Sequence, residues 1–260
     1  MNKVLFLILF LIIFIIKKSN QNVYNNDEIL KINLFKLSNN QSIKKLGNNI
    51  FVIDNFYNNP DNIRKYALDN KSKYIVHSAL YKTDFFNPFL YSNVSADLIK
   101  YFEKISNTKI DYSQWDKDVT KQSNGFIQLI TKKSNPVVHR DVHWGVIVYL
   151  TPNPINPSGT SLYRHKQTNV AHTEDCILLK NKNINKIECK YMVKNDLWKE
   201  GEESKIDKWE INHRVENRYN RAIIFDGRNF HASDGGFGNN VNDGRLFQTF
   251  FFSPFKHNHF

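Results

Sequence analysis

The segment PVVHRDVHWGVIVYLTP, residues 136–152, constrains the fold most because an H-x-D triplet stands at the start of a strongly apolar β-pattern. Successive side chains of a strand point to opposite faces, so His139 and Asp141 share one face. An imidazole and a carboxylate on one face can bind the same cation. Two ligands do not complete a metal site, so we expect a third ligand from elsewhere in the chain.

Composition sets the broad class. A chain of 260 residues with 41% hydrophobic and 14% aromatic residues can bury one good core, so one globular domain is expected. The formal charge of +11, from 36 Lys and Arg minus 25 Asp and Glu, is spread among many asparagines. Scattered charge favours a solvated basic surface over a polyanion-binding patch. Nucleic acid is therefore disfavoured as a partner.

The N-terminal residues 1–22 predict a signal or membrane-anchor segment. An unbroken apolar run, residues 4–16, is preceded by Lys3 and followed by Lys17 and Lys18. A helix of that length reaches about 20 Å, whereas the hydrocarbon core of a bilayer is about 30 Å thick. No small-residue cleavage site follows, which favours an uncleaved anchor. We expect the protein at a membrane or in the secretory pathway, with its orientation undecided because lysines flank both ends.

The next part of the chain predicts a stalk, a strand and two helices. Residues 23–48 are polar and Asn-rich and lead as a stalk into a first strand. Residues 51–53 continue as a strand, and Asn59 with Pro60 marks the start of a helix. A second helix is expected from about Ala96, with apolar residues at helical spacing. Both helices are expected to pack against the core.

Alternating apolar residues predict the remaining strands. They fall at 124–131, 160–165, 221–225 and 244–254, in addition to the opening segment. Residues 166–219 interrupt this pattern, and we interpret them as an insertion, either a lid or a decorated loop. His165 and His172 are read as loop histidines. Cys176 and Cys189, inside the insertion, are either a disulfide-closed hairpin or two reduced thiols.

His231 is the natural third ligand. It follows the tight turn at Asp226 and Gly227, where an antiparallel roll can return it to the first pair. Two histidines and one carboxylate on one face of a metal leave three positions open, as in non-haem Fe(II) oxygenases. Arg245 on the closing strand adds a cation that needs an anion if it faces a core. His143 is a rival ligand, although a stacking role beside Trp144 is favoured.

These features together resemble a known family. The order of H-x-D, a strand ending in YL, a G-T turn, a distal histidine and a G-R strand is similar to the Fe(II)/2-oxoglutarate-dependent dioxygenase superfamily, in its prolyl-hydroxylase-like branch. The resemblance spans residues 49–254. The segments IDNFYNNPDNIRKYA and WEINHRVENRYNRAIIFDGRNFH resemble a poorly characterised bacterial and viral group within it. The implied fold is mainly β with flanking helices, a double-stranded β-helix or jelly roll over residues 49–260, preceded by the N-terminal apolar anchor helix.

The resemblance also implies a site. His139, Asp141 and His231 would bind Fe(II) and act as the catalytic centre, and Arg245 would bind the distal carboxylate of 2-oxoglutarate. O₂ is the second co-substrate, succinate is a product, and ascorbate is an auxiliary reductant. The expected reaction is hydroxylation of a protein side chain or a small metabolite.

The chain departs from the family pattern in two places. A Ser or Thr often stands two residues after the arginine, where this chain has Phe247. A tyrosine often found on the strand before H-x-D is missing from FIQLIT. Gln128, Thr131 or Tyr149 would then supply the hydrogen bond, and we assign Gln128 and Tyr149 to the co-substrate site.

A non-oxidative alternative stays open at this point. A cupin-like metal binder, or a β-roll that recognises a glycan or another ligand, would also use an H-x-D strand and a distal histidine. Arg245 discriminates between the two, because a simple binder has no need of a cation on the closing strand.

Overall fold

The computed structural model describes residues 34–47, 49–70, 96–111, 125–132, 136–178, 184–197, 199 and 203–254. The chain divides into two compact units, Met1–Lys36 and Leu37–Phe260. The segment expected to be a signal or anchor, residues 1–22, and the stalk up to residue 33 lie outside the described residues. Within the described ranges, no helix is both long and apolar enough to cross a membrane.

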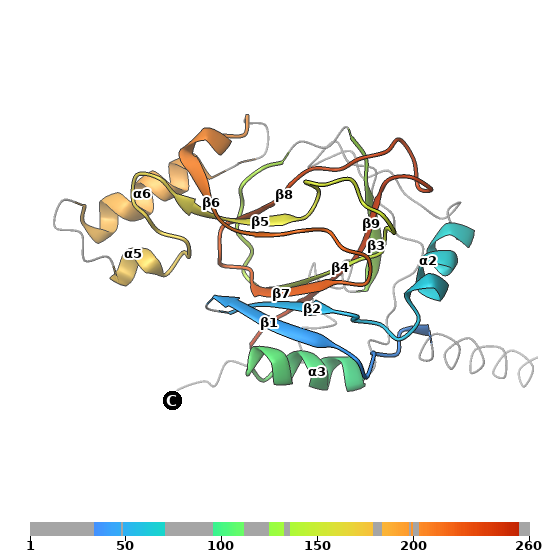
Figure 1. The fold of residues 1–260 in the computed structure, drawn as a ribbon. Helices are drawn as coiled ribbons and strands as arrows, with labels where there is room; N and C mark the ends of the chain where they lie inside the picture. The colour runs from blue at the N-terminus through green and yellow to red at the C-terminus, as the bar shows by residue number, and fades with distance from the viewer. Residues whose placement is uncertain are drawn as a thin grey trace, which may run out of the picture. The chain divides into compact units, whose positions relative to one another are not determined.

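A six-stranded antiparallel sheet forms the larger β-layer of the second unit (Figure 1). Its central strands are the apolar runs WGVIVY, AIIFD and RLFQTFFF, which are buried along nearly their whole length. Short apolar runs of this kind predict strands that are covered on both faces. In sheet order the strands are β1 (Ser42–Gly47), β2 (Ile50–Asp54), β7 (Ala222–Asp226), β4 (Trp144–Tyr149), β9 (Arg245–Phe252) and β3 (Phe126–Ile130).

A three-stranded antiparallel sheet forms the second β-layer. Its order is β6 (Trp209–Val215), β5 (Thr160–His165) and β8 (His231–Ser233), and His139 forms an isolated bridge to its edge. The predicted insertion at 166–219 is therefore too long, because its last part contains β6. Most side chains of this edge strand, WEINHRV, reach solvent, so polar residues interrupt the apolar alternation that would have identified it.

The core lies between the two sheets. Tyr149 on β4 faces Phe247 on β9, and Leu162 of the smaller sheet packs into the same cluster. Arg245 shares this inner face, because its guanidinium lies 4.7 Å from the Phe247 ring centroid. The buried members of the cluster are Ile50, Val52, Ile130, Tyr149, Leu162, Val215, Ile223, Phe225 and Phe247.

The two predicted packing helices are present. In α2 (Pro60–Asp69), the Asn59 side chain accepts a hydrogen bond from the backbone N–H of Asn62, which satisfies a free donor of the first turn. In α3 (Ala96–Ser106), Phe102 lies 5.4 Å from Phe250 and 5.5 Å from Phe252, measured between ring centroids. This helix thus covers the face of β9 that points away from the smaller sheet.

The remaining insertion packs on the outer face of the smaller sheet. It contains α5 (Asp175–Leu178), α6 (Lys186–Asp196) and a short 3-10 helix, η3 (Ile206–Lys208). Cys176 and Cys189 form a disulfide that joins α5 to α6. His165, which we expected in a loop, is instead the buried last residue of β5. Its Nε2 lies 3.1 Å from an Asp196 carboxylate oxygen, which ties α6 to the sheet.

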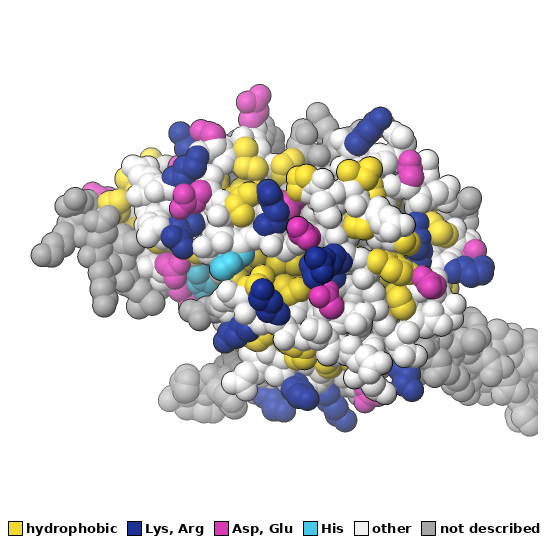
Figure 2. Space-filling view, in the orientation of Figure 1, with side chains coloured by type: hydrophobic (Ala, Val, Ile, Leu, Met, Phe, Trp, Pro, Cys, Tyr) yellow, Lys and Arg dark blue, Asp and Glu magenta, His cyan; other side chains and the backbone are white. Residues whose placement is uncertain are grey.

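Charged side chains are interleaved on the surface shown in Figure 2. Lys and Arg side chains are spread over this face of the molecule, with Asp and Glu side chains among them. A mixed pattern of this kind produces a weaker local potential than a block of one sign. On this face, the arrangement agrees with a solvated basic surface.

Candidate metal centre and buried arginine

Two histidines from distant parts of the chain face each other across an isolated β-bridge. The backbone N–H of His139 donates to the carbonyl of His231 at 3.0 Å, and that of His231 donates to the carbonyl of His139 at 2.9 Å. Residues that exchange both bonds stand directly opposite each other, so their side chains share a face. The two ring centroids are 4.3 Å apart. The His231 ring also packs edge-on against Phe225, a member of the core cluster, so this face looks between the sheets.

Backbone carbonyls orient both imidazoles. The Nδ1 atom of His139 lies 3.0 Å from the carbonyl oxygen of Val137, and that of His231 lies 2.8 Å from the carbonyl oxygen of Asn229. A carbonyl oxygen only accepts hydrogen bonds, so each Nδ1 carries the proton. The lone pair of each neutral ring is then on Nε2. Metal-binding histidines in proteins are commonly held by such a bond from the second ring nitrogen.

Asp141 completes a group of three possible metal ligands. Its Oδ2 lies 3.3 Å from Nε2 of His231, and the ligand atoms of His139, Asp141 and His231 all lie within 4.8 Å of one another. The backbone N–H of Asp141 donates to the carbonyl of Gly227 at 2.8 Å, which fixes the start of β4 against the turn after β7. The sequence-predicted ligands are thus brought together, about ninety residues apart in the chain.

The surroundings favour the ligand forms of His139 and Asp141. Burial, together with the charge of His231, lowers the pKa of His139 to about 4, so its ring is neutral near pH 7. Burial by itself would raise the pKa of Asp141. A hydrogen bond from His231, made when its Nε2 also carries a proton, and the charges of protonated neighbouring histidines outweigh that effect and bring the pKa to about 2; a metal would take the place of the Nε2 proton. Neutral imidazole and ionised carboxylate are the forms that bind a metal.

Gly227 is required for the close approach that positions Asp141. A Cβ atom at Gly227 would lie 2.1 Å from the carbonyl oxygen of His143 and 2.8 Å from Cβ of Asp141. Both contacts are shorter than atoms tolerate, and the first involves rigid backbone. A larger residue must therefore push the turn away from the start of β4.

We expect Gly227→Ala to lower the free energy of unfolding by roughly 1–3 kcal/mol, because the overpacked turn has to move. Urea denaturation measures this change. Gly47→Ala is the matched control, since the nearest contact of its Cβ is 3.3 Å from a histidine side-chain atom, which can give way. A Gly227→Ala variant as stable as the Gly47→Ala variant would contradict the steric argument.

His143 lies outside the group of three. Its Nδ1 is 2.5 Å from the hydroxyl oxygen of Ser253, just after β9. The hydroxyl therefore occupies one ring nitrogen. The group that could hold a metal contains His139, Asp141 and His231, and His143 is not part of it.

Arg245 is a buried cation without a carboxylate partner among the described residues. It is 1% exposed, and its two terminal nitrogens donate to the Ser233 hydroxyl at 2.6 Å and to the Gly159 carbonyl at 3.0 Å. Its Nε donates to no acceptor within the described part of the chain. Burial lowers the pKa of Arg245, which reflects the cost of holding the charge away from water. A nearby anion would offset the cost of burying this charge.

A small polar group surrounds Arg245 in an otherwise apolar core. The guanidinium lies 5.5 Å from the Tyr149 ring centroid, and the Tyr149 hydroxyl hydrogen-bonds to the Thr160 hydroxyl at 2.8 Å. Burial raises the pKa of Tyr149, so this hydroxyl keeps its proton and remains a donor. Ser233 and Thr160 are hydroxyl residues that the sequence analysis did not identify.

Gln128, the other residue assigned to the co-substrate site, is linked less directly to Arg245. It stands opposite Phe247, on the inner face of β3, and its amide donates to the Thr249 hydroxyl at 2.8 Å. Tyr149 thus lies beside Arg245, whereas Gln128 bonds to a residue further along β9.

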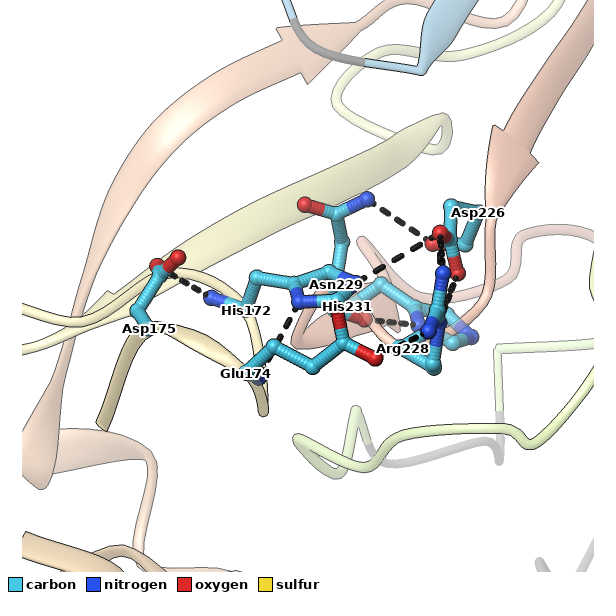
Figure 3. A network of polar contacts seen from close by, with 7 residues as sticks. All are labelled: His172, Glu174, Asp175, Asp226, Arg228, Asn229 and His231. Carbon is cyan, nitrogen blue, oxygen red and sulfur yellow. Dashed lines mark hydrogen bonds and ion pairs between the residues drawn. The ribbon is translucent and has the colours of Figure 1, made fainter. Parts of the chain in front are cut away.

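An ion-pair network borders the triad (Figure 3). Asp226 at the end of β7 binds the guanidinium of Arg228, and its Oδ2 lies 3.5 Å from Nε2 of His172. Arg228 also pairs with Glu174. Burial would raise the pKa of Asp226, but the hydrogen bonds from His172 and Arg228 hold it well below its usual range. No motif in the sequence indicated this network, because its members come from β7, the next turn and the insertion.

Two neutral imidazoles and one carboxylate form a donor set suited to Fe(II) and other divalent transition metals, with coordination positions left over for other ligands.

Comparison with known proteins adds a family assignment. The model of DUF6445, a family of unknown function, matches residues 37–252. No match was found among curated proteins.

Proposed function

Since the chain belongs to the DUF6445 family, whose function is unknown, we propose from its site that it is a non-haem Fe(II)- and 2-oxoglutarate-dependent oxygenase. The observation that carries the proposal is the pairing of two features on the inner faces of the sheets. One is the triad of His139, Asp141 and His231, and the other is Arg245, a buried cation that forms no ion pair among the described residues. A metal site alone would not explain why the core holds a cation.

We further propose that the two sheets form a double-stranded β-helix. In chain order, β3, β4, β7 and β9 belong to the larger sheet, whereas β5, β6 and β8 belong to the smaller one. The bridge at His139 adds a contact to the smaller sheet between β3 and β4. The chain therefore passes repeatedly from one sheet to the other, as a jelly roll requires.

The triad residues fit the iron. His139 and His231 would bind it through Nε2, since their Nδ1 atoms are held by carbonyls, and Asp141 would bind through its carboxylate. These ligands occupy one face, so the opposite face stays open to co-substrates. When bound, Fe(II) with 2-oxoglutarate and O₂ supplies the oxidising chemistry, with succinate and CO₂ as products and one oxygen atom delivered to the substrate.

The residues near Arg245 fit a dicarboxylate. A guanidinium has five donors, and the Nε donor of Arg245 has no acceptor among the described residues. Its unpaired Nε would donate to the distal carboxylate, and the Tyr149 and Ser233 hydroxyls are near enough to the guanidinium to contribute. Ser233 would then take the place of the Ser or Thr that is Phe247 here. The apolar cluster around this group keeps water away and strengthens the ion pair.

We propose an unidentified protein or small molecule as the substrate and a membrane or secretory location for the protein. The support for the location is indirect. The Cys176–Cys189 disulfide is the kind of bond that persists in oxidising compartments, and residues 1–22 have the composition of a signal or anchor.

The proposal is tested with full-length protein, Fe(II), ascorbate and 2-oxoglutarate labelled at C1. We expect slow release of labelled CO₂ and an equal amount of succinate without added substrate, because the site binds both co-substrates. A screen of peptides and metabolites for a mass gain of one oxygen then identifies the substrate. Metal binding without any 2-oxoglutarate binding would reject the oxygenase and leave a metal-binding β-roll.

A further inference from the structure

One turn supplies the acceptors that orient two of the three triad residues. Residues 226–230 connect β7 to β8. The carbonyl of Gly227 accepts from the backbone N–H of Asp141 at 2.8 Å, and the carbonyl of Asn229 lies 2.8 Å from Nδ1 of His231. Any shift of this turn therefore moves both a carboxylate and an imidazole of the triad.

Asp226 organises this turn from within. Its carbonyl accepts from the backbone N–H of Asn229 at 3.0 Å and from the Asn229 side-chain amide at 2.8 Å. Its carboxylate accepts from the backbone N–H of Arg228 at 3.1 Å and from the Arg228 guanidinium at 2.6 and 2.9 Å. Charge-assisted, two-pronged bonds of this kind fix geometry more firmly than single neutral bonds.

The insertion holds the turn from outside. Residues 170–175 run antiparallel to the turn, with Phe230 N–H donating to the Ala171 carbonyl at 3.1 Å and Thr173 N–H donating to the Arg228 carbonyl at 3.2 Å. His172 bridges to Asn229 in the same ladder. Figure 3 shows the side chains of His172 and Arg228 both reaching Asp226.

The contact from His172 to Asp226 has a defined direction. The Nδ1 of His172 accepts from the backbone N–H of Glu174 at 3.1 Å, so the ring proton is on Nε2, which lies 3.5 Å from Oδ2 of Asp226. Asp175 in turn accepts from the backbone N–H groups of Ala171 and His172, both at 2.9 Å. The disulfide at the next residue, Cys176, anchors this segment to α6.

We propose that Asp226 is the positioning residue of the metal centre, and that it uses Arg228 together with His172 of the insertion to hold the carbonyls that orient Asp141 and His231. The segment 170–175 is then part of the metal site rather than a surface decoration. The inference rests on the proposed function, since it assumes that the triad binds a metal. Partners that orient metal ligands typically change metal affinity by about 10- to 100-fold when they are replaced.

The test is the affinity of full-length Asp226→Asn for Co(II), measured by titration, together with the visible spectrum of the bound Co(II), which reports the arrangement of its ligands. Asparagine keeps the shape but cannot accept two charge-assisted bonds from Arg228. We expect Co(II) binding to weaken by roughly 10- to 100-fold and the spectrum to change.

Asp54→Asn is the matched control. Asp54 makes the same two-pronged pair with Arg221, at 2.6 and 2.9 Å, beside the opposite end of β7 and about 13 Å of strand from Asp226. We expect it to lower the melting temperature by a smaller amount, because the Asp54 side chain is more exposed than that of Asp226, and to leave Co(II) affinity and spectrum unchanged. If Asp226→Asn does not fold, His172→Ala is expected to weaken Co(II) binding about threefold to tenfold through the same contact.

The outcomes separate the two proposals. The metal centre, and this inference with it, would be overturned by either of two results. One is that the wild-type protein does not bind Co(II), and the other is that the His139→Ala variant binds Co(II) with the wild-type affinity. Wild-type binding that the His139→Ala change abolishes, combined with equal affinity and spectrum in Asp226→Asn and Asp54→Asn, would overturn the positioning role alone. If Asp226→Asn does not fold, unchanged Co(II) binding in His172→Ala would likewise overturn the positioning role alone.

Discussion

Alanine at His139, Asp141 or His231 is expected to abolish 2-oxoglutarate turnover and to weaken metal binding by more than about 100-fold. Each change removes one of three ligands whose donor atoms lie within 4.8 Å of one another. The remaining two ligands cannot hold a divalent cation against water and buffer. The loss should therefore exceed the effect of changing any residue that only orients the ligands.

Two measurements check this result. Labelled CO₂ from 2-oxoglutarate reports turnover, and metal analysis after desalting reports retention of iron. His143→Ala is the matched control, because His143 is close in sequence yet bonded to Ser253 and outside the group of three. It should keep most of its iron. A triad variant with wild-type turnover would remove that residue from the site.

The second large effect is expected at Arg245. Replacement by methionine should raise the concentration of 2-oxoglutarate needed for half-saturation by about 100-fold, or about 3 kcal/mol, because a buried charge-assisted bond to the ligand is lost. Iron binding should be nearly unchanged. The free energy of unfolding should change by less than about 2 kcal/mol, since an apolar side chain of similar length also removes a buried, unpaired cation.

Three readouts distinguish a ligand role from a structural one. Isothermal titration measures 2-oxoglutarate binding to the metal-loaded protein, metal analysis measures iron, and urea denaturation measures stability. Arg245→Lys is the matched variant, because it keeps the charge but cannot reach both Ser233 and Gly159 in a planar fork. It should bind 2-oxoglutarate with intermediate affinity. Equal loss of iron and of 2-oxoglutarate binding in Arg245→Met would indicate that Arg245 is structural.

Local pattern was sufficient for much of the fold. The alternation of apolar residues located β3, β4, β5, β7 and β9, and Asn59 with Pro60 located the start of α2. Pattern failed for β6, where one strand at the edge of a sheet carries mostly solvated side chains. It also left the two cysteines undecided, since pairing depends on whether α5 and α6 bring Cys176 and Cys189 together, which they do.

The candidate site was predictable only in part. His139 and Asp141 were identified because spacing of two along a strand is a local property. His231 was identified by the tight turn before it, and Arg245 by the recognisable strand on which it stands. The hydroxyl of Ser233 and the carboxylate of Asp226 carry no such mark. Ser233 bonds to Arg245, 12 residues further along the chain, and Asp226 contacts His172, 54 residues earlier (226 minus 172), and no local pattern connects either pair.

The sequence by itself determined where most of the strands lie, which faces of those strands are apolar, and which residue types are available as ligands, because these depend on neighbours along the chain. Only the tertiary structure decided that His231 pairs with His139, that Arg245 is buried with no ion pair among the described residues, and that residues 170–175 contact the turn next to the triad. Such contacts depend on how the two sheets and the insertion pack, and packing joins residues that no local pattern connects.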